Sequence, residues 1–123
     1  MRYKSKYRNK KVIYKDIKFD SIVEKERYIY LKKKEAEGKI YDLKLQQRFI
    51  LQDSFTYRNK TIRAIYYIAD FSYINANGGL VIEDVKGVQT TEFKLKAKMF
   101  KYKYSDILFY VVKRKGINWI IEE

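Results

Sequence analysis

Two carboxylates and one lysine stand on neighbouring segments of this sequence that are otherwise mostly apolar. Asp70 lies in YIADFSYI, and Asp84 and Lys86 lie in LVIEDVKG, after the turn-like stretch NANGG. Carboxylate oxygens are the ligands that a hard ion such as Mg²⁺ prefers. Such an ion can acidify a water molecule and stabilise negative charge on a phosphate, and a lysine can neutralise the same charge. The three residues therefore predict metal-assisted phosphate chemistry.

Strand periodicity indicates which of these side chains can meet. Residues two apart in a strand share a face, so Asp84 and Lys86 point the same way. Glu83 points to the other face, where we expect either a solvent-side acid or a support for the site. A hairpin partner would lay Asp70 beside Asp84. The plainer alternatives are a cross-strand ion-pair pattern for Asp84 and Lys86, and a strand end for Asp70.

Composition narrows the chemistry further. The chain has 123 residues, which predicts one domain spanning residues 1–123, and it has neither Cys nor His. Disulfides, zinc sites built from Cys or His, and Ser-His triads are therefore excluded. No apolar run approaches the ~20 residues of a membrane span, and no apolar segment follows the basic N-terminus as in a signal peptide. We expect a cytoplasmic protein without a membrane partner.

The charge balance points to a polyanionic partner. The formal net charge is +13, from 28 Lys and Arg against 15 Asp and Glu. A field of this sign favours nucleic acid. Codon bias in an AT-rich genome is an alternative explanation for many lysines, although it does not explain why acids are few. Residues 1–11 are expected to form a flexible basic tail, and Lys10 and Lys11 are candidate DNA contacts.

The first half of the chain predicts a short β segment, a helix and a strand. Residues 11–21 alternate around Val12 and Phe19, with a turn at 15–16. A helix follows in residues 20–40, with Ser21 as N-cap, Glu24 completing a capping box, and Gly38 closing the helix. Residues 40–52 then form a strand with one buried face, because four apolar residues recur at even spacing: Leu43, Leu45, Phe49 and Leu51.

The second half predicts a hairpin, a strand, a helix and two further strands. Residues 54–74 turn at 58–60, and residues 75–79 carry a strong turn signal before the strand at 80–87. The next helix, residues 90–104, carries an apolar stripe of Phe93, Ala97, Phe100 and Tyr104. Strands at 106–112 and 117–123 complete an α/β fold, a mixed sheet flanked by helices, in the order (β)-α-β-β-β-α-β-β.

Four blocks of the sequence resemble a nuclease family. Ala69-Asp70 and Asp84-Val85-Lys86 resemble the motif of the PD-(D/E)XK nuclease superfamily, with alanine at the proline position. The α-β-β-β-α-β part of the predicted element order is that of the superfamily's core. KFDSIVEKERY, DLKLQQRF, YIADFSY and IEDVKG more closely resemble a family of small phage proteins related to Holliday-junction resolvases. The resemblance implies a restriction-endonuclease-like core, and a bacterial host cytoplasm if the protein is phage-encoded.

The resemblance also implies roles for individual residues. Asp70 and Asp84 would bind Mg²⁺ or Mn²⁺, with the backbone carbonyl of Val85 as a further ligand, and Lys86 would position the attacking water. Glu24 would complete the catalytic and metal site, although it is alternatively only a capping acid. Gln46 matches a glutamine of the family blocks and would orient water or a phosphate. Because resolvases of this superfamily act as dimers, the resemblance implies a homodimer.

The second predicted helix follows the motif directly. This position favours Lys94 and Lys98 as phosphate contacts, whereas a merely solvated helix face is the alternative. The sequence thus favours a metal-dependent DNA endonuclease, most plainly one selective for branched DNA. Two other classes stay open: a non-catalytic basic DNA-binding protein that keeps the fold, and another nuclease of the same superfamily that nicks DNA or processes ends.

Overall fold

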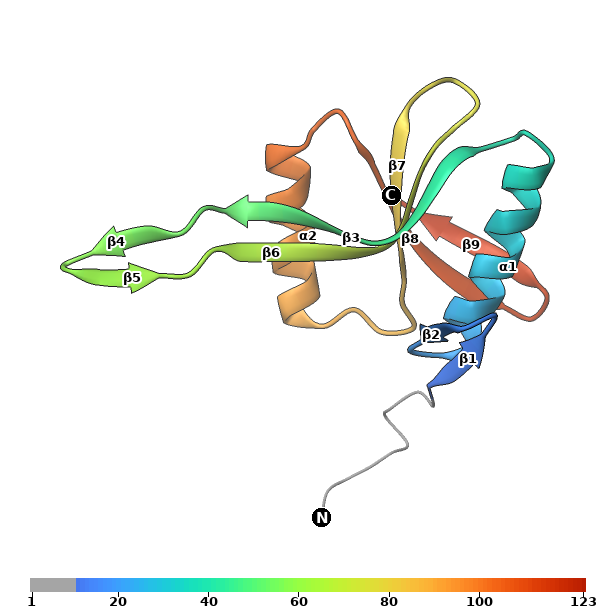
Figure 1. Cartoon of the computed structure of the whole chain (residues 1–123), viewed down its shortest axis with the longest axis horizontal. Coiled ribbons are helices and arrows are strands. Elements are labelled where there is room, and N and C mark those ends of the chain that lie inside the picture. The colour runs from blue at the N-terminus through green and yellow to red at the C-terminus, as the bar shows by residue number, and fades with distance from the viewer. Residues whose placement is uncertain (1–10) are drawn as a thin grey trace, which may run out of the picture.

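The computed structural model describes residues 11–123, which form a mixed β-sheet with two helices (Figure 1). The elements in chain order are β1 (Val12–Tyr14), β2 (Ile17–Phe19), α1 (Ile22–Ala36), β3 (Tyr41–Gln52), β4 (Phe55–Tyr57), β5 (Lys60–Ile62), β6 (Ile65–Ile74), β7 (Leu80–Val85), α2 (Thr91–Lys103), β8 (Leu108–Lys115) and β9 (Asn118–Glu122). The predicted basic tail lies outside the described residues, apart from Lys11.

The main sheet has five strands in the order β3-β6-β7-β8-β9. Strands β7 and β8 are parallel, with α2 as the crossover, and the other neighbouring pairs are antiparallel. The pairs β1-β2 and β4-β5 form two small separate sheets. The predicted α/β fold with a mixed sheet is confirmed, and the finer likeness to a restriction-endonuclease core stays a prediction.

Two apolar clusters hold the helices against the sheet. The α2 stripe packs in one cluster with Ile82, and α1 packs in the other with Val81. These two residues are neighbours on β7, so the clusters lie on opposite faces of that strand. As predicted, the stripe of α2 is buried at Phe93, Ala97 and Phe100. Strand β7 is therefore enclosed on both faces, which explains its nearly continuous apolar sequence.

Local signals set the ends of α1. The side chain of Ser21 accepts a hydrogen bond from the backbone N–H of Glu24, and Gly38 follows the helix with φ of +73°. Both features confirm the prediction. The reciprocal half of the predicted capping box was wrong, because the Glu24 carboxylate accepts from the N–H of Asp20 rather than that of Ser21. Because the hydrogen bond from Asp20 uses only Oε1 of Glu24, Oε2 is left for contacts with other segments.

Strand β3 does not keep one face buried, contrary to the expectation for residues 40–52. Leu43 and Leu45 pack with the α1 cluster, whereas Phe49 and Leu51 belong to the α2 cluster. Between them Gln46 has φ of +54°, outside the extended region. The strand therefore changes its orientation at Gln46 and serves both layers.

The hairpin predicted in residues 54–74 is divided into two parts. Residues Ile65–Ile74 form β6 of the main sheet, while β4 and β5 form a separate two-stranded arm that extends away from the body (Figure 1). All six strand residues of this arm are exposed. The turn lies at Arg58 and Asn59, which have φ of +48° and +68°, as in the type I′ turns that suit tight hairpins.

A second turn brings the two motif strands together. Oδ1 of Asn75 accepts hydrogen bonds from the N–H groups of Asn77 and Gly79, and Gly78 has φ of +85°, so the predicted turn before β7 is confirmed. The β6–β7 ladder runs from Ile74–Leu80 to Phe71–Glu83. Among the described residues, no helix has both the length and the apolar character required to cross a lipid bilayer.

Candidate active site

The site lies where β6 and β7 separate. The last pair of their ladder is Phe71 and Glu83, and the adjacent residues beyond that pair are Asp70 on β6 and Asp84 on β7. At this point Oδ2 of Asp70 accepts a hydrogen bond of 2.8 Å from the N–H of Val85. A side-chain carboxylate thus replaces a backbone carbonyl at the point of divergence, and the two predicted acids are brought to one place.

Asp84 is almost fully buried and has two partners. Its Oδ2 accepts a hydrogen bond of 2.6 Å from the Tyr67 hydroxyl, and its Oδ1 lies 3.0 Å from Nζ of Lys86. Oδ1 has no hydrogen bond of regular geometry, so this oxygen is held by the ion pair alone. Burial and the Asp84 carboxylate raise the pKa of Tyr67. The phenol therefore stays protonated and donates to Asp84.

Asp70 is a buried acid with the carboxylates of Asp84 and Glu24 nearby. Burial raises its pKa to about 8, and the neighbouring carboxylates of Asp84 and Glu24 add to the rise, against the opposing effects of the Val85 N–H and Lys86. Burial also raises the pKa of Glu24, and the carboxylates of Asp20 and Asp84 contribute to it. Carboxylates that disfavour each other's charge in this way are stabilised by a proton or by a cation.

Gln46 and Glu24 approach the same place from β3 and α1. Nε2 of Gln46 lies 3.5 Å from Oε2 of Glu24, a long hydrogen bond, and Gln46 itself is exposed. Glu24 is 6% exposed and comes from the first turn of α1. The helix cap, the unusual backbone at Gln46 and the end of the β6–β7 ladder thus converge on one site.

The donor set can be compared with what a divalent ion requires. Within residues 11–123, no group of three or more His, Cys, Asp or Glu side chains is arranged to hold a metal ion. Mg²⁺, however, is commonly held by one or two carboxylates, with water and substrate phosphate completing its ligands. Asp70 and Asp84 fit that minimal requirement, since Oδ1 of Asp84 is buried and has no hydrogen-bond partner of regular geometry. The N–H of Val85 donates to Asp70, and the role of the Val85 carbonyl as a metal ligand stays a prediction.

A cleft of about 770 Å³ opens beside Asp84 and Lys86. Its lining continues along the first turns of α2 and the start of β6, as far as Ala64 at the base of the arm. Lys96 of α2 lines it and lies 3.3 Å from Glu92. Asp70 is not among the lining residues, so a nucleic-acid backbone that enters this cleft would meet Lys86 and Lys96 beside Asp84.

Among residues 11–123, none of the predicted DNA contacts lines the cleft. Lys94 and Lys98 are exposed on α2, outside the residues that line the cleft, and Lys98 lines a separate apolar hollow with Leu51 and Tyr102. Lys11 is exposed and lies 3.0 Å from Asp20. Lys10 falls outside the described residues. The lysine that α2 contributes to the lining of the cleft is Lys96.

Glu83 was predicted to be a solvent-side acid or a support for the site, and the solvent-side alternative is wrong. It is fully buried under α1, where Arg27 donates two hydrogen bonds to it, of 2.8 and 2.7 Å. The Tyr73 hydroxyl also donates to Glu83. The physical reason is that the α1 layer covers this face of β7 and supplies a matching cation. Glu83 and Asp84 therefore serve two separate charge networks on opposite faces of one strand.

Two residues of the site were not expected from the sequence. Tyr67 lies in an apolar run typical of a core strand, and Lys96 is one of many lysines on α2. No local pattern distinguishes either residue from its neighbours. Both acquire their place only from the packing of α2 and β6 around β7.

Comparisons with known proteins identify a family. No curated protein and no solved structure matches the chain. The model of a family described as "Protein of unknown function (DUF1064)" matches residues 4–117, which include every residue of the site described above. The chain belongs to the DUF1064 family.

Proposed function

We propose that the protein is a metal-dependent endonuclease that hydrolyses phosphodiester bonds in DNA. The observation that carries the proposal is the juxtaposition of Asp70, Asp84 and Lys86 where β6 and β7 separate, with Asp84 and Lys86 lining an open cleft. Buried carboxylates this close together disfavour each other's charge, as the raised pKa of Asp70 shows, and a bound cation would relieve that repulsion. The net charge of +13 supports a polyanionic substrate.

Each residue of the chain would have a distinct task. Asp70 and Asp84 would hold Mg²⁺ or Mn²⁺, and Tyr67 would fix the orientation of Asp84 through its hydrogen bond. The ion, when bound, supplies Lewis acidity toward the phosphate and its attacking water. Lys86 would orient that water and offset charge on the phosphate. Glu24 and Gln46 would complete the site from α1 and β3.

The substrate and assembly follow as parts of the same proposal. The likeness of four sequence blocks to resolvase-related phage proteins supports branched DNA as the substrate. It also supports a homodimer, since two strands of a junction are cut symmetrically. A host cytoplasm would be the place of action for a phage-encoded protein. Nicking or end processing by a nuclease of the same superfamily is the closest variant of this proposal.

The decisive experiment measures cleavage and binding separately. Labelled four-way junction, duplex and single-stranded DNA are incubated with the protein in Mg²⁺, Mn²⁺ or Ca²⁺. Lys86→Ala should reduce cleavage on the order of 10²-fold or more, the scale of one lost preorganised electrostatic group. Asp84→Asn should abolish cleavage, while binding in Ca²⁺ should be kept by both variants because other phosphate contacts remain.

Matched controls separate these effects from a general loss of charge. Asp106→Asn and Lys33→Ala make the same changes at exposed positions and should cleave like the wild type. Thermal melting of all four variants shows whether each is folded. If the wild-type protein binds DNA but cleaves none of the three forms with either Mg²⁺ or Mn²⁺, the nuclease proposal fails.

A second candidate function is that of a DNA-binding protein without catalysis. One observation favours it: among residues 11–123, no three metal-ligating side chains are arranged around a common ion position. Calorimetry distinguishes the two candidates. A nuclease should bind Mn²⁺ or Mg²⁺ with loss of binding in Asp84→Asn, whereas the non-catalytic alternative predicts no binding in either protein.

A further inference from the structure

We propose that the arm, residues 54–64 with β4 and β5, contacts DNA about one helical turn away from the reacting phosphate. This inference rests on the proposed function, because it names a second contact between the same DNA and this chain. Its observable is the extent and strength of DNA binding, which does not require cleavage. The two proposals can therefore fail independently.

The arm is exposed on both of its faces. All six residues of β4 and β5 are exposed, including Phe55, Tyr57 and Ile62. Three paired residues a side give a hairpin that is marginally stable on its own in water. A marginal ribbon that extends from the body, as in Figure 1, is well suited to gain its stability from a bound partner.

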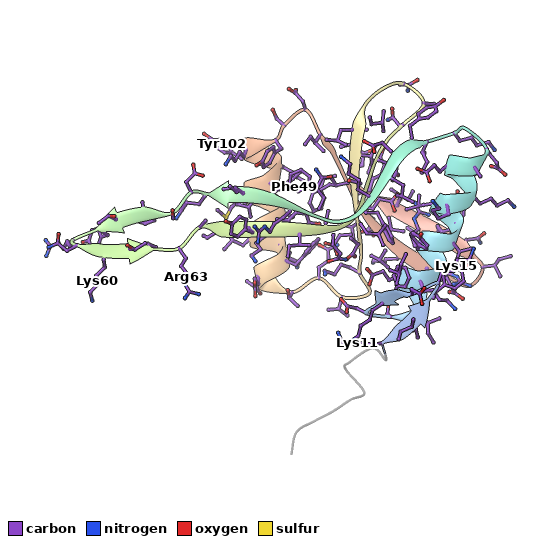
Figure 2. All side chains as sticks on the ribbon, viewed as in Figure 1. Lys11, Lys15, Phe49, Lys60, Arg63 and Tyr102 are labelled. Atoms are coloured by element: carbon purple, nitrogen blue, oxygen red, sulfur yellow. The ribbon has the colours of Figure 1, made fainter. Side chains whose placement is uncertain are left out.

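Charge selects DNA as that partner. Residues 54–64 contain Arg58, Lys60 and Arg63 and no acid. Figure 2 shows Lys60 near the free end of the arm and Arg63 near its base, both with side chains that extend away from the ribbon. A second copy of this chain also has a net charge of +13 and so offers these cations no net electrostatic attraction. DNA phosphates instead attract these cations and release counterions on binding.

The shape and side-chain pattern of the arm also fit a duplex. The major groove, about 12 Å wide, admits a two-stranded β-ribbon. The register pairs Phe55 with Ile62 and Tyr57 with Lys60 on one face, and Thr56 with Thr61 on the other. The face with the threonines offers hydroxyls for base edges or phosphates. The other face, with Phe55, Ile62, Tyr57 and Lys60, offers apolar contacts beside a cation.

The chain between the arm and the site sets the distance that one duplex must cover. Lys60 precedes Asp70 by ten residues, which span at most about 33–36 Å when extended. One turn of duplex DNA is about 34 Å. The cleft beside Asp84 reaches Ala64, at the base of the arm. A straight duplex with a phosphate at Lys86 can therefore pass along the cleft and meet the arm near the next turn.

The test compares three proteins by hydroxyl-radical footprinting and by titration of a labelled duplex several turns long, in Ca²⁺. The first is the wild type. The second is the triple variant Arg58→Ala, Lys60→Ala and Arg63→Ala. The third replaces residues 53–64 by Asn-Gly, a turn that can join the paired residues Gln52 and Ile65. We expect both variants to lose the outer part of the footprint and to bind on the order of tenfold more weakly.

The salt dependence gives the second readout. Each lost phosphate contact should reduce the slope of log affinity against log salt by about 0.9. The matched control, Lys32→Ala, Lys33→Ala and Lys39→Ala, removes three exposed cations at the end of α1 and should keep the full footprint. An unchanged footprint and slope in the arm variants overturn the proposal. So does a change in oligomeric state without DNA, which would make the arm a contact between copies.

Discussion

The Tyr67 hydroxyl donates a hydrogen bond of 2.6 Å to Oδ2 of Asp84, across from the ion pair that Lys86 makes with Oδ1. The two partners fix the plane of a carboxylate that is 3% exposed. Tyr67 thus acts as a positioning residue in the proposed nuclease, since it reaches the chemistry only through Asp84.

The first prediction compares two buried tyrosines on β6. Tyr67→Phe should lower the free energy of unfolding by about 1–3 kcal/mol, because it leaves a buried carboxylate oxygen without its donor. Tyr73→Phe removes the donor to Glu83 on the opposite face and should cost a similar amount. Denaturant titration measures both. Only Tyr67→Phe should also reduce cleavage, and equal activity in the two variants would remove Tyr67 from the site.

The second prediction concerns pH. The pKa of Asp70 in the metal-free fold is about 8, above its ordinary value of 3.8, so the folded state binds more protons than the unfolded state between these values. The contribution of Asp70 to stability is therefore greatest below pH 4 and is lost as the pH rises through about 8. Asp70→Asn should flatten the dependence of melting temperature on pH across this interval.

The same protonation makes metal binding depend on pH. An ion must displace the proton of Asp70, so Mn²⁺ affinity should rise with pH up to about 8 and protons should be released on binding. Calorimetry in two buffers of different ionisation enthalpy counts those protons. Binding of equal strength at pH 6 and pH 8 would contradict this assignment.

The third prediction concerns the buried pair of Arg27 and Glu83. Their side chains are 3% and 0% exposed, and Arg27→Ala leaves Glu83 as an uncompensated buried charge. The expected loss is about 3–5 kcal/mol. The double variant Arg27→Met with Glu83→Leu should recover most of it, because both charges are then gone. A double variant as unstable as Arg27→Ala would show that packing rather than charge dominates.

The fourth prediction uses the backbone of β3. Glycine within a strand normally costs about 0.5–1 kcal/mol, and Arg48→Gly should show that loss. Gln46→Gly should cost less or stabilise the protein, because glycine adopts the observed φ of +54° without strain. If Gln46 serves the reaction, cleavage should fall although stability does not. Equal destabilisation by the two substitutions would argue against strain at Gln46.

The sequence predicted those parts of the fold that depend on neighbouring residues. Helix α2 follows from the spacing of its buried residues, and α1 begins directly after Ser21 because the short polar side chain of this N-cap satisfies a free N–H group there. The turn before β7 follows from Asn75 and its glycines. The acids and lysine of the site were predicted as one group, since the period of a strand decides which side chains share a face.

The rest depends on contacts between distant segments. The pairing of Arg27 with Glu83 joins residues 56 positions apart, and no local pattern can specify such a partner. The same holds for Tyr67, whose hydroxyl reaches Asp84 only because β6 and β7 separate beside α2. The change of face in β3 depends on one unusual dihedral angle at Gln46, a residue type that normally avoids it.

The attachment of the arm has a consequence for how this family can diversify. The chain leaves the body at Gln52 and returns at Ile65, and these two residues are directly paired. The segment between them can therefore lengthen, shorten or be exchanged without altering the buried layers, as insertions at exposed hairpin ends usually can. Evolution or protein engineering can thus replace the DNA-contacting arm while the buried layers, the acids and the lysine of the site stay unchanged.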